Sequence, residues 1–153
     1  MRKLIPAAAL LMAAVGTANA DGASNGSQVF DTSCAFCHQA GGVGVPGQFP
    51  RLAGRVGEIA SKPEGRNFLP QVLLNGMSGR VTVDGEQILG IMPGFDSMSD
   101  DDMAALLTYL TGLDHAPVAY TVDDIKAARA QPRLAPGDVA AQRADLAEKK
   151  IVP

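Results

Sequence analysis

Apolar residues recur at helical spacing in several parts of the chain, and the clearest case is residues 100–113. Its apolar positions are three or four residues apart, so they share one face of a helix. Ser99 is a good N-cap, Asp102 stands three positions later as its capping partner, and Gly112 marks the end. The aspartates at 100–102 also place negative charge at the positive end of this helix. The apolar stripe consists of Met103, Leu106, Leu107, Leu110 and Leu113.

Two further helical patterns precede this one. Gly26, Phe30 and Cys34 are four residues apart, which places them on one face of a predicted helix that runs to about Cys37. Another helix is predicted from about Glu64 to Asn75. Its supporting residues are Pro63 in the first turn, the apolar Phe68, Val72 and Leu73, and Gly76 as a stop. Pro70 inside the segment argues against the helix or implies a kink.

Glycines mark the connections between these helices. Four glycines within residues 41–47 are incompatible with an ordinary helix or strand, and they predict a loop whose backbone can approach a bound group closely. Residues 80–91 carry β-prone side chains on both sides of Asp84-Gly85, a pair typical of tight turns. We therefore expect a small hairpin or turn at that point.

The chain changes character after residue 113. Prolines and a glycine separate two short, alanine-rich and charged stretches, 121–131 and 138–150, which are both predicted to be helical. Thr121 and Asp138 are the expected N-caps. Because the two stretches are weakly apolar, we expect them to lie on the surface of the main domain or to project from it.

The first 20 residues have the pattern of a secretory signal peptide. Two basic residues precede a short apolar run, and Ala18-Asn19-Ala20 provides a small-residue site for cleavage after Ala20. The apolar run is shorter than the about 20 residues of a membrane span, so an uncleaved anchor is the weaker alternative. The sequence thus predicts a periplasmic protein without a membrane span after cleavage. It would have one domain over 21–113 and an extension over 114–153 that is helical or partly disordered.

Composition limits both the partners and the core. Without Arg2 and Lys3 the 13 basic residues become 11 against 16 acidic ones, so the mature net charge is −5. A net acidic chain argues against a nucleic-acid partner. Five Phe, two Tyr and no Trp leave a small domain short of large core side chains. A buried cofactor would supply the missing apolar volume.

The chemistry is concentrated in Cys34-Ala35-Phe36-Cys37-His38, a C-x-x-C-H sequence typical of c-type haem attachment. Each cysteine can form a thioether to one haem vinyl group, and His38 can then bind the iron from one side. A disulfide between these two cysteines would close a very small loop and stabilise little. A thioredoxin-like pair would need a βαβ context, and a zinc site would need four ligands, for which only His115 remains as a further Cys or His.

The second axial ligand decides what such an iron can do. The mature chain offers Met77, Met92, Met98, Met103 and His115. Met92 precedes Pro93-Gly94, so we expect it in a loop, where its sulfur can be directed at the iron without bending a helix. Met98 is its main rival, and Met103 belongs to the apolar stripe. Met92 is therefore the favoured ligand.

These features together resemble a class I cytochrome c of the small bacterial monohaem type. The resemblance covers about residues 25–113. It rests on the Gly26–Phe30–Cys34 helix leading into CAFCH, the glycine-rich run HQAGGVGVPGQFPRLAG, the segment LLNGMSGRVTVDGEQILGIMPGF, the pair Met92-Pro93, and the last helix DDDMAALLTYL with Tyr109. All five in this order are highly specific, whereas C-x-x-C-H alone is specific only for haem.

The resemblance implies an all-α cytochrome c fold. Three to four helices would surround one covalently bound haem c, with a small hairpin or turn before the distal methionine and a helical C-terminal extension. Cys34 and Cys37 would be the thioether anchors, His38 and Met92 the axial ligands, and the Pro50 carbonyl would accept a hydrogen bond from His38. The propionate partners stay open between Arg55 and Arg80.

Three functions stay open at this point. The first is a one-electron carrier, itself no enzyme, that serves redox proteins such as a dehydrogenase, a cytochrome complex or an oxidase, as a monomer or as part of a complex. The second is a dedicated cytochrome subunit of a periplasmic dehydrogenase, with residues 114–153 as its binding arm. The third is a haem enzyme or gas sensor with an open distal site. A net charge of +2 over 51–66 and four aspartates over 96–102 could orient a redox partner.

Overall fold

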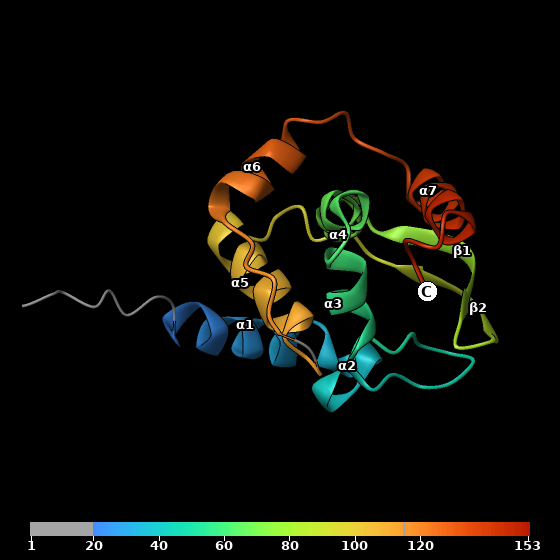
Figure 1. Cartoon of the computed structure of the whole chain (residues 1–153), viewed down its shortest axis with the longest axis horizontal. Coiled ribbons are helices and arrows are strands. Elements are labelled where there is room, and N and C mark those ends of the chain that lie inside the picture. The colour runs from blue at the N-terminus through green and yellow to red at the C-terminus, as the bar shows by residue number, and fades with distance from the viewer. Residues whose placement is uncertain (1–19, 115) are drawn as a thin grey trace, which may run out of the picture.

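The computed structural model describes residues 20–114 and 116–153, and within them it has seven α-helices and one two-stranded antiparallel sheet (Figure 1). Residues 1–19 of the predicted signal peptide, and His115, lie outside the described residues. In chain order the elements are α1 (Ala20–Ser33), α2 (Ala35–His38), the short 3-10 turn η1 (Ala40–Gly42), α3 (Arg55–Ala60), α4 (Pro63–Asn75), β1 (Met77–Val83), β2 (Glu86–Met92), α5 (Asp100–Thr111), α6 (Val122–Arg129) and α7 (Pro136–Glu148).

Helices α1 and α5 pack against each other at one side of the molecule, and the hairpin β1–β2 lies at the other side with α7 over β1 (Figure 1). Helices α3 and α4 stand between these two groups. The core runs through all three groups and continues into the C-terminal segment. Its fully buried side chains include Phe30, Met103, Leu106, Leu107, Ile125 and Val139.

The two predicted central helices form as expected. Ser99 caps α5 by accepting a hydrogen bond from the Asp102 N–H at 3.1 Å, and its hydroxyl donates to the Asp102 carboxylate at 2.8 Å. Helix α4 begins at Pro63 and ends before Gly76, which has φ 71°. Such a left-handed φ explains why glycine serves as the stop.

The hairpin is longer than the sequence pattern suggested. Its strands pair from Met77↔Met92 to Val83↔Glu86, so only Asp84 and Gly85 form the turn. Both turn residues have positive φ, 53° and 83°. Two such residues define the tight turn whose twist matches that of the flanking strands, which is why Asp-Gly is favoured there.

Two local predictions were wrong, and one helix was missed. The helix expected to run to Cys37 ends at Ser33, and α2 follows after Cys34, whose φ of −124° breaks the helical path. Helix α3 was not foreseen, because its six residues contain Gly57 and are too short to show a period. Helix α7 is not capped by Asp138: it starts at Pro136, whose fixed φ and missing N–H suit the first helical position.

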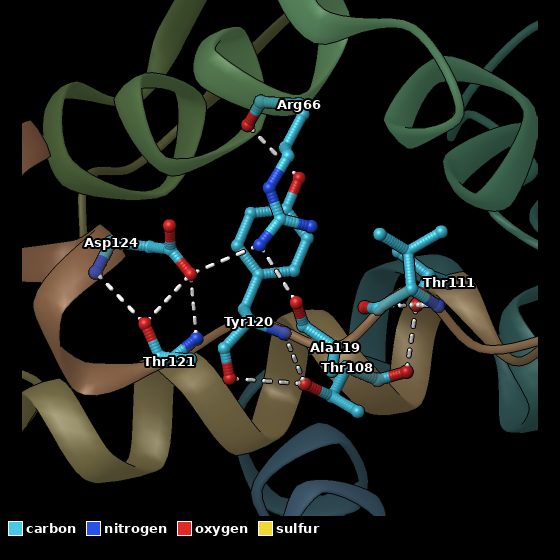
Figure 2. Close-up of polar contacts among 8 residues, drawn as sticks. Arg66, Thr108, Thr111, Ala119, Tyr120, Thr121 and Asp124 are labelled. Carbon is cyan, nitrogen blue, oxygen red and sulfur yellow. Dashed lines mark hydrogen bonds and ion pairs between the residues drawn. The ribbon is translucent and has the colours of Figure 1, made fainter.

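Residues 116–153, here called the tail, fold back on the rest of the molecule. Figure 2 shows the joint at its start, where the Tyr120 hydroxyl donates to the Arg66 carbonyl at 2.9 Å and the Arg66 guanidinium lies 4.4 Å from the centre of the Tyr120 ring. Further along, Arg129 pairs with Asp100 at 2.6 Å. Buried tail residues are Tyr120, Ile125, Ala128, Val139, Leu146, Ile151 and Val152. The tail therefore lies on the main domain and contributes to its core.

Candidate functional site

The crossing of α1 and α5 positions the C-x-x-C-H sequence. A Cβ added to Gly26 would stand 2.2 Å from the Ala105 carbonyl oxygen, so only glycine permits this approach. One helical turn later, the Phe30 and Tyr109 rings meet with centroids 5.7 Å apart. The Cys34 N–H then donates to the Phe30 carbonyl at 2.8 Å. The first cysteine is thus tied to the last turn of α1.

Both cysteines are free thiols that line one cavity. Cys34 is buried and Cys37 is half-buried. Burial, and to a lesser extent the neighbouring Cys37, raise the pKa of the Cys34 thiol to about 11. Cys34 is the N-cap of α2 and Cys37 lies within it, so one helical turn brings both thiols to the same cavity.

His38 is held by a hydrogen bond between its Nδ1 and the Pro50 carbonyl oxygen, 2.8 Å apart. The carbonyl can only accept, so Nδ1 carries the proton and Nε2 keeps its lone pair. Burial lowers the pKa of His38, although the Pro50 bond opposes this shift. The ring is therefore neutral at pH 7. The hydrogen bond to Pro50 also fixes its orientation, as the bond from the non-ligating ring nitrogen does in metal-binding histidines.

The loop between His38 and Pro50 depends on Gly44. This residue has φ 69°, and a Cβ on it would lie 2.6 Å from the Phe49 carbonyl oxygen. Its N–H donates to the His38 carbonyl at 2.8 Å. The predicted glycine loop thus brings the Pro50 carbonyl within reach of the histidine ring.

The cavity has two lobes that share six lining residues. The outer lobe contains about 790 Å³ of space, open solvent included, and reaches the surface beside Phe49, Ile91 and Pro93. The inner lobe contains about 840 Å³ on the same measure and is lined mostly by apolar side chains of α3, α4 and α5. The shared residues are Cys34, His38, Pro50, Met77, Val81 and Met92.

Met92 lines both lobes, but it is not in a loop: it is the last residue of β2. The hairpin sets its direction, because residues 88, 90 and 92 share the face of β2 that lines the cavity. Leu89 on the other face is 74% exposed, and Ile91, which touches the cavity only where it opens, is 82% exposed. The Phe95 N–H donates to the Leu73 carbonyl at 2.7 Å and fixes the chain just beyond. Met92 is thus positioned by strand register.

The structure changes the ranking of the rival methionines. Met77 is the cross-strand partner of Met92 and lines both lobes as well. Met98 lines neither lobe, and Met103 is fully buried in the core. Strand pairing therefore makes Met77, and not Met98, the main alternative to Met92.

Sequence reasoning missed most of the cavity wall. Val81 and Ile88 line it from the hairpin, and alternation along the strands could have indicated them. Arg143 of α7 also lines the inner lobe, from the far end of the sequence. Of the two expected propionate partners, Arg55 lines that lobe, whereas Arg80 is exposed and donates to Gln87 at 3.1 Å.

The predicted charge asymmetry is largely used inside the molecule. Arg66 pairs with Asp124 of the tail at 3.0 Å, and Lys62 donates to the Lys150 carbonyl. On the acidic side, Asp96 pairs with Arg133 at 3.1 Å, and Asp100 pairs with Arg129. These charges join the tail to the domain, which weakens the case for partner steering.

The donor set fits a haem. One neutral imidazole, two free thiols and a thioether sulfur line a mostly apolar cavity. In contrast, no group of three Cys, His, Asp or Glu side chains is placed to hold a bare metal ion within the described part of the chain.

Residues 23–114 match the cytochrome c family, and the chain belongs to it as a class I c-type cytochrome. A cytochrome c carries covalently bound haem c and transfers electrons, which agrees with the site. Within the described residues no helix is long and apolar enough to cross a membrane.

Two relatives are cytochromes c-552 of Thermus thermophilus. One is 38% identical over 146 residues, covering 92% of this chain and 95% of the relative, and the other is 39% identical over 132 residues, covering 82% and 99%. Because residues 1–114 are only about three-quarters of the 153 residues, both alignments extend into the tail. A third relative, one of the subunits of a nicotinate dehydrogenase from Pseudomonas putida, is 36% identical over 88 residues, covering 57% of this chain and 7% of that protein.

Proposed function

We propose that the chain is an exported one-electron carrier whose haem c is ligated by His38 and Met92. The observation that carries the proposal is one cavity that receives both free cysteines, a buried histidine whose Nδ1 is held by the Pro50 carbonyl, and a strand-fixed methionine. When bound, the haem supplies an iron that accepts and releases a single electron. The residues of the chain attach the haem and supply its ligands.

Each residue has a separate task. Cys34 and Cys37 attach the group covalently, which prevents its loss outside the cytoplasm. His38 offers Nε2 to the iron while Pro50 holds its Nδ1–H, and the carbonyl raises the donor strength of the ring. Met92 offers its sulfur from the hairpin, and thioether ligation favours the reduced iron.

A carrier follows from saturation of both axial positions. If His38 and Met92 both held the iron, no position would stay open for a substrate, and neither side chain would need to move when an electron arrives. The apolar walls of the inner lobe further disfavour the extra charge of the oxidised state. These properties serve electron transfer and not catalysis.

The partners would be redox proteins such as a dehydrogenase, a cytochrome complex or an oxidase, approached from the periplasm. Exposed apolar side chains surround the outer lobe, with Phe36 90% and Ile91 82% exposed. The tail is less suited to act as a binding arm, because Ile125 and Val139 are fully buried against its own domain.

The test replaces the methionines one at a time in the holoprotein. Met92→Ala should abolish the weak far-red band that methionine gives with oxidised haem iron, and it should allow rapid CO binding after reduction. Met77→Ala is the matched control, because it removes the same side chain from the paired position, and it should keep the band.

Two results would overturn the proposal. Loss of the band in Met77→Ala but not in Met92→Ala would move the ligand across the hairpin. A wild-type protein without the band that binds CO rapidly would instead be an open-site haem protein, such as an enzyme or gas sensor.

A further inference from the structure

The inner lobe of the cavity contains an unusual excess of positive charge. Three arginines line it, Arg51 from the loop before α3, Arg55 from α3 and Arg143 from α7 of the tail. No aspartate or glutamate is among its lining residues in the described chain. The rest of the wall is apolar except for the cysteine and His38 shared with the outer lobe, so the arginines form its one strongly polar end.

A single carboxylate serves two of these arginines. Asp84, in the hairpin turn, contacts Arg51 at 2.9 Å and Arg55 at 3.0 Å. Arg55 has the greater need of a counter-charge, because its side chain is only 8% exposed to water while that of Asp84 is 44% exposed. Arg55 also donates to the Pro153 carbonyl at the end of the tail. Counting side chains alone, three cations and one anion leave a net charge of about +2 beside the lobe.

Of these three arginines, Arg143 is the one without an acidic partner among the described residues. Its one hydrogen bond runs to the Thr82 carbonyl of β1, at 3.0 Å. Burial, and then the nearby Arg55, lower its pKa, yet a guanidinium stays protonated in proteins. Two cations therefore line the same apolar cavity, close enough to repel each other. Such an arrangement is costly unless an anion lies between them.

We propose that Arg143 of the tail, together with Arg55, binds the propionate carboxylates of the haem. The inference rests on the proposed function, because it requires the haem to occupy the inner lobe. A haem carries two propionates, whose combined charge of −2 would balance the excess. Planar guanidinium groups recognise carboxylates through two parallel hydrogen bonds. The tail is then part of the cofactor site, and it is neither an arm nor a mere cover.

The experiment compares two neutral replacements within the tail of the holoprotein. Arg143→Gln should lower the reduction potential, because a positive charge near the iron favours the reduced state. It should also shift the propionate bending mode in the resonance Raman spectrum. Arg133→Gln is the matched control: it makes the same charge change on the same tail, but Arg133 is exposed, pairs with Asp96 and lines neither lobe. It should leave both readouts at their wild-type values.

Arg143→Lys separates charge from geometry and guards against misfolding of the glutamine variant. Lysine keeps the charge, so the potential should return most of the way to wild type while the Raman mode stays shifted. If Arg143→Gln and Arg143→Lys both leave the mode and the potential unchanged, Arg143 only ties α7 to β1 through Thr82, and the proposal is wrong. The far-red methionine band tests the axial ligands independently, so it distinguishes this failure from failure of the proposed function.

Discussion

Two joints hold this molecule together, and they use different chemistry. At the crossing of α1 and α5, contact depends on the missing side chain of Gly26 and on the packing of Phe30 against Tyr109. At the start of the tail, contact depends on directed polar groups around one buried ring, that of Tyr120. The first joint sets where the cysteines lie, and the second returns the tail toward the inner lobe.

The polar joint is fully connected (Figure 2). The Thr108 hydroxyl accepts from the Tyr120 N–H at 2.9 Å, and the Thr111 hydroxyl accepts from the Val118 N–H at 2.9 Å. Thr121 and Asp124 then cap α6 reciprocally. Backbone groups that leave a helix for a new segment need such partners. A close-packed joint is destabilised by added side-chain volume, whereas a polar joint is destabilised when one buried polar group loses its hydrogen-bond partner.

The largest effect should come from volume at the first joint. Gly26→Val would bring side-chain atoms into steric clash with the Ala105 carbonyl and force the helices apart. We therefore expect a loss of about 3 kcal/mol or more in the free energy of unfolding. Chemical denaturation of the holoprotein measures it. Gly137→Ala is the control, because nothing lies within 4 Å of a Cβ there and its φ is not positive. Equal stability of the two variants would mean that the crossing is not close-packed.

A smaller effect should separate the two tyrosines. Tyr120→Phe removes the donor to the Arg66 carbonyl while keeping the buried ring, which should cost about 1 kcal/mol. Tyr109→Phe makes the same change at the helix crossing, where the ring makes the contact with Phe30, and should cost much less. Both are measured as shifts of the denaturation midpoint. If Tyr109→Phe were the more damaging, the contrast between the joints would be wrong.

The smallest effect concerns pH. A hydrogen bond from Arg51, then the charges of Arg51 and Arg55, hold the pKa of Asp84 below its usual range. A lowered folded-state pKa stabilises the protein above the unfolded-state value of about 3.9 and loses that contribution as pH falls further. Asp84→Asn should therefore be less stable than wild type at pH 7, by less than about 1 kcal/mol for so exposed a pair. The difference should disappear as the pH falls below about 4 and through the lowered pKa of the folded state.

Thermal unfolding between pH 7 and pH 3 measures this difference. Asparagine tolerates the left-handed φ of residue 84, so the turn itself should survive. Asp31→Asn, on the exposed face of α1, is the control and should leave the pH profile unchanged. A difference that persisted unchanged at pH 3 would show that Asp84 acts through the turn and not through its charge.

Local patterns predicted α4, α5 and the Asp84-Gly85 turn because each is encoded by adjacent residues. The family followed from the spacing of short sequences such as CAFCH. The packing of the weakly apolar tail was harder to predict. Single apolar residues such as Ile125 and Val139 are enough to hold it on the domain once a surface is present to bury them. Arg143 could not be predicted as a cavity residue, because its place depends on how α7 packs on β1. Tertiary contacts decide where these residues lie, and the local pattern of apolar residues carries no information about such contacts.

The register of the β1–β2 hairpin decides which of its side chains line the cavity. Side chains alternate between its two faces, so a slip of β2 by a single residue would exchange every inward position for an outward one. Met92 would then turn to solvent, and Ile91, now 82% exposed where the outer lobe opens, would take the inward position. The two-residue turn at Asp84 and Gly85 is what fixes the pairing. A turn at the far end of the sheet thus decides whether a sulfur or only hydrocarbon lines the cavity at this point.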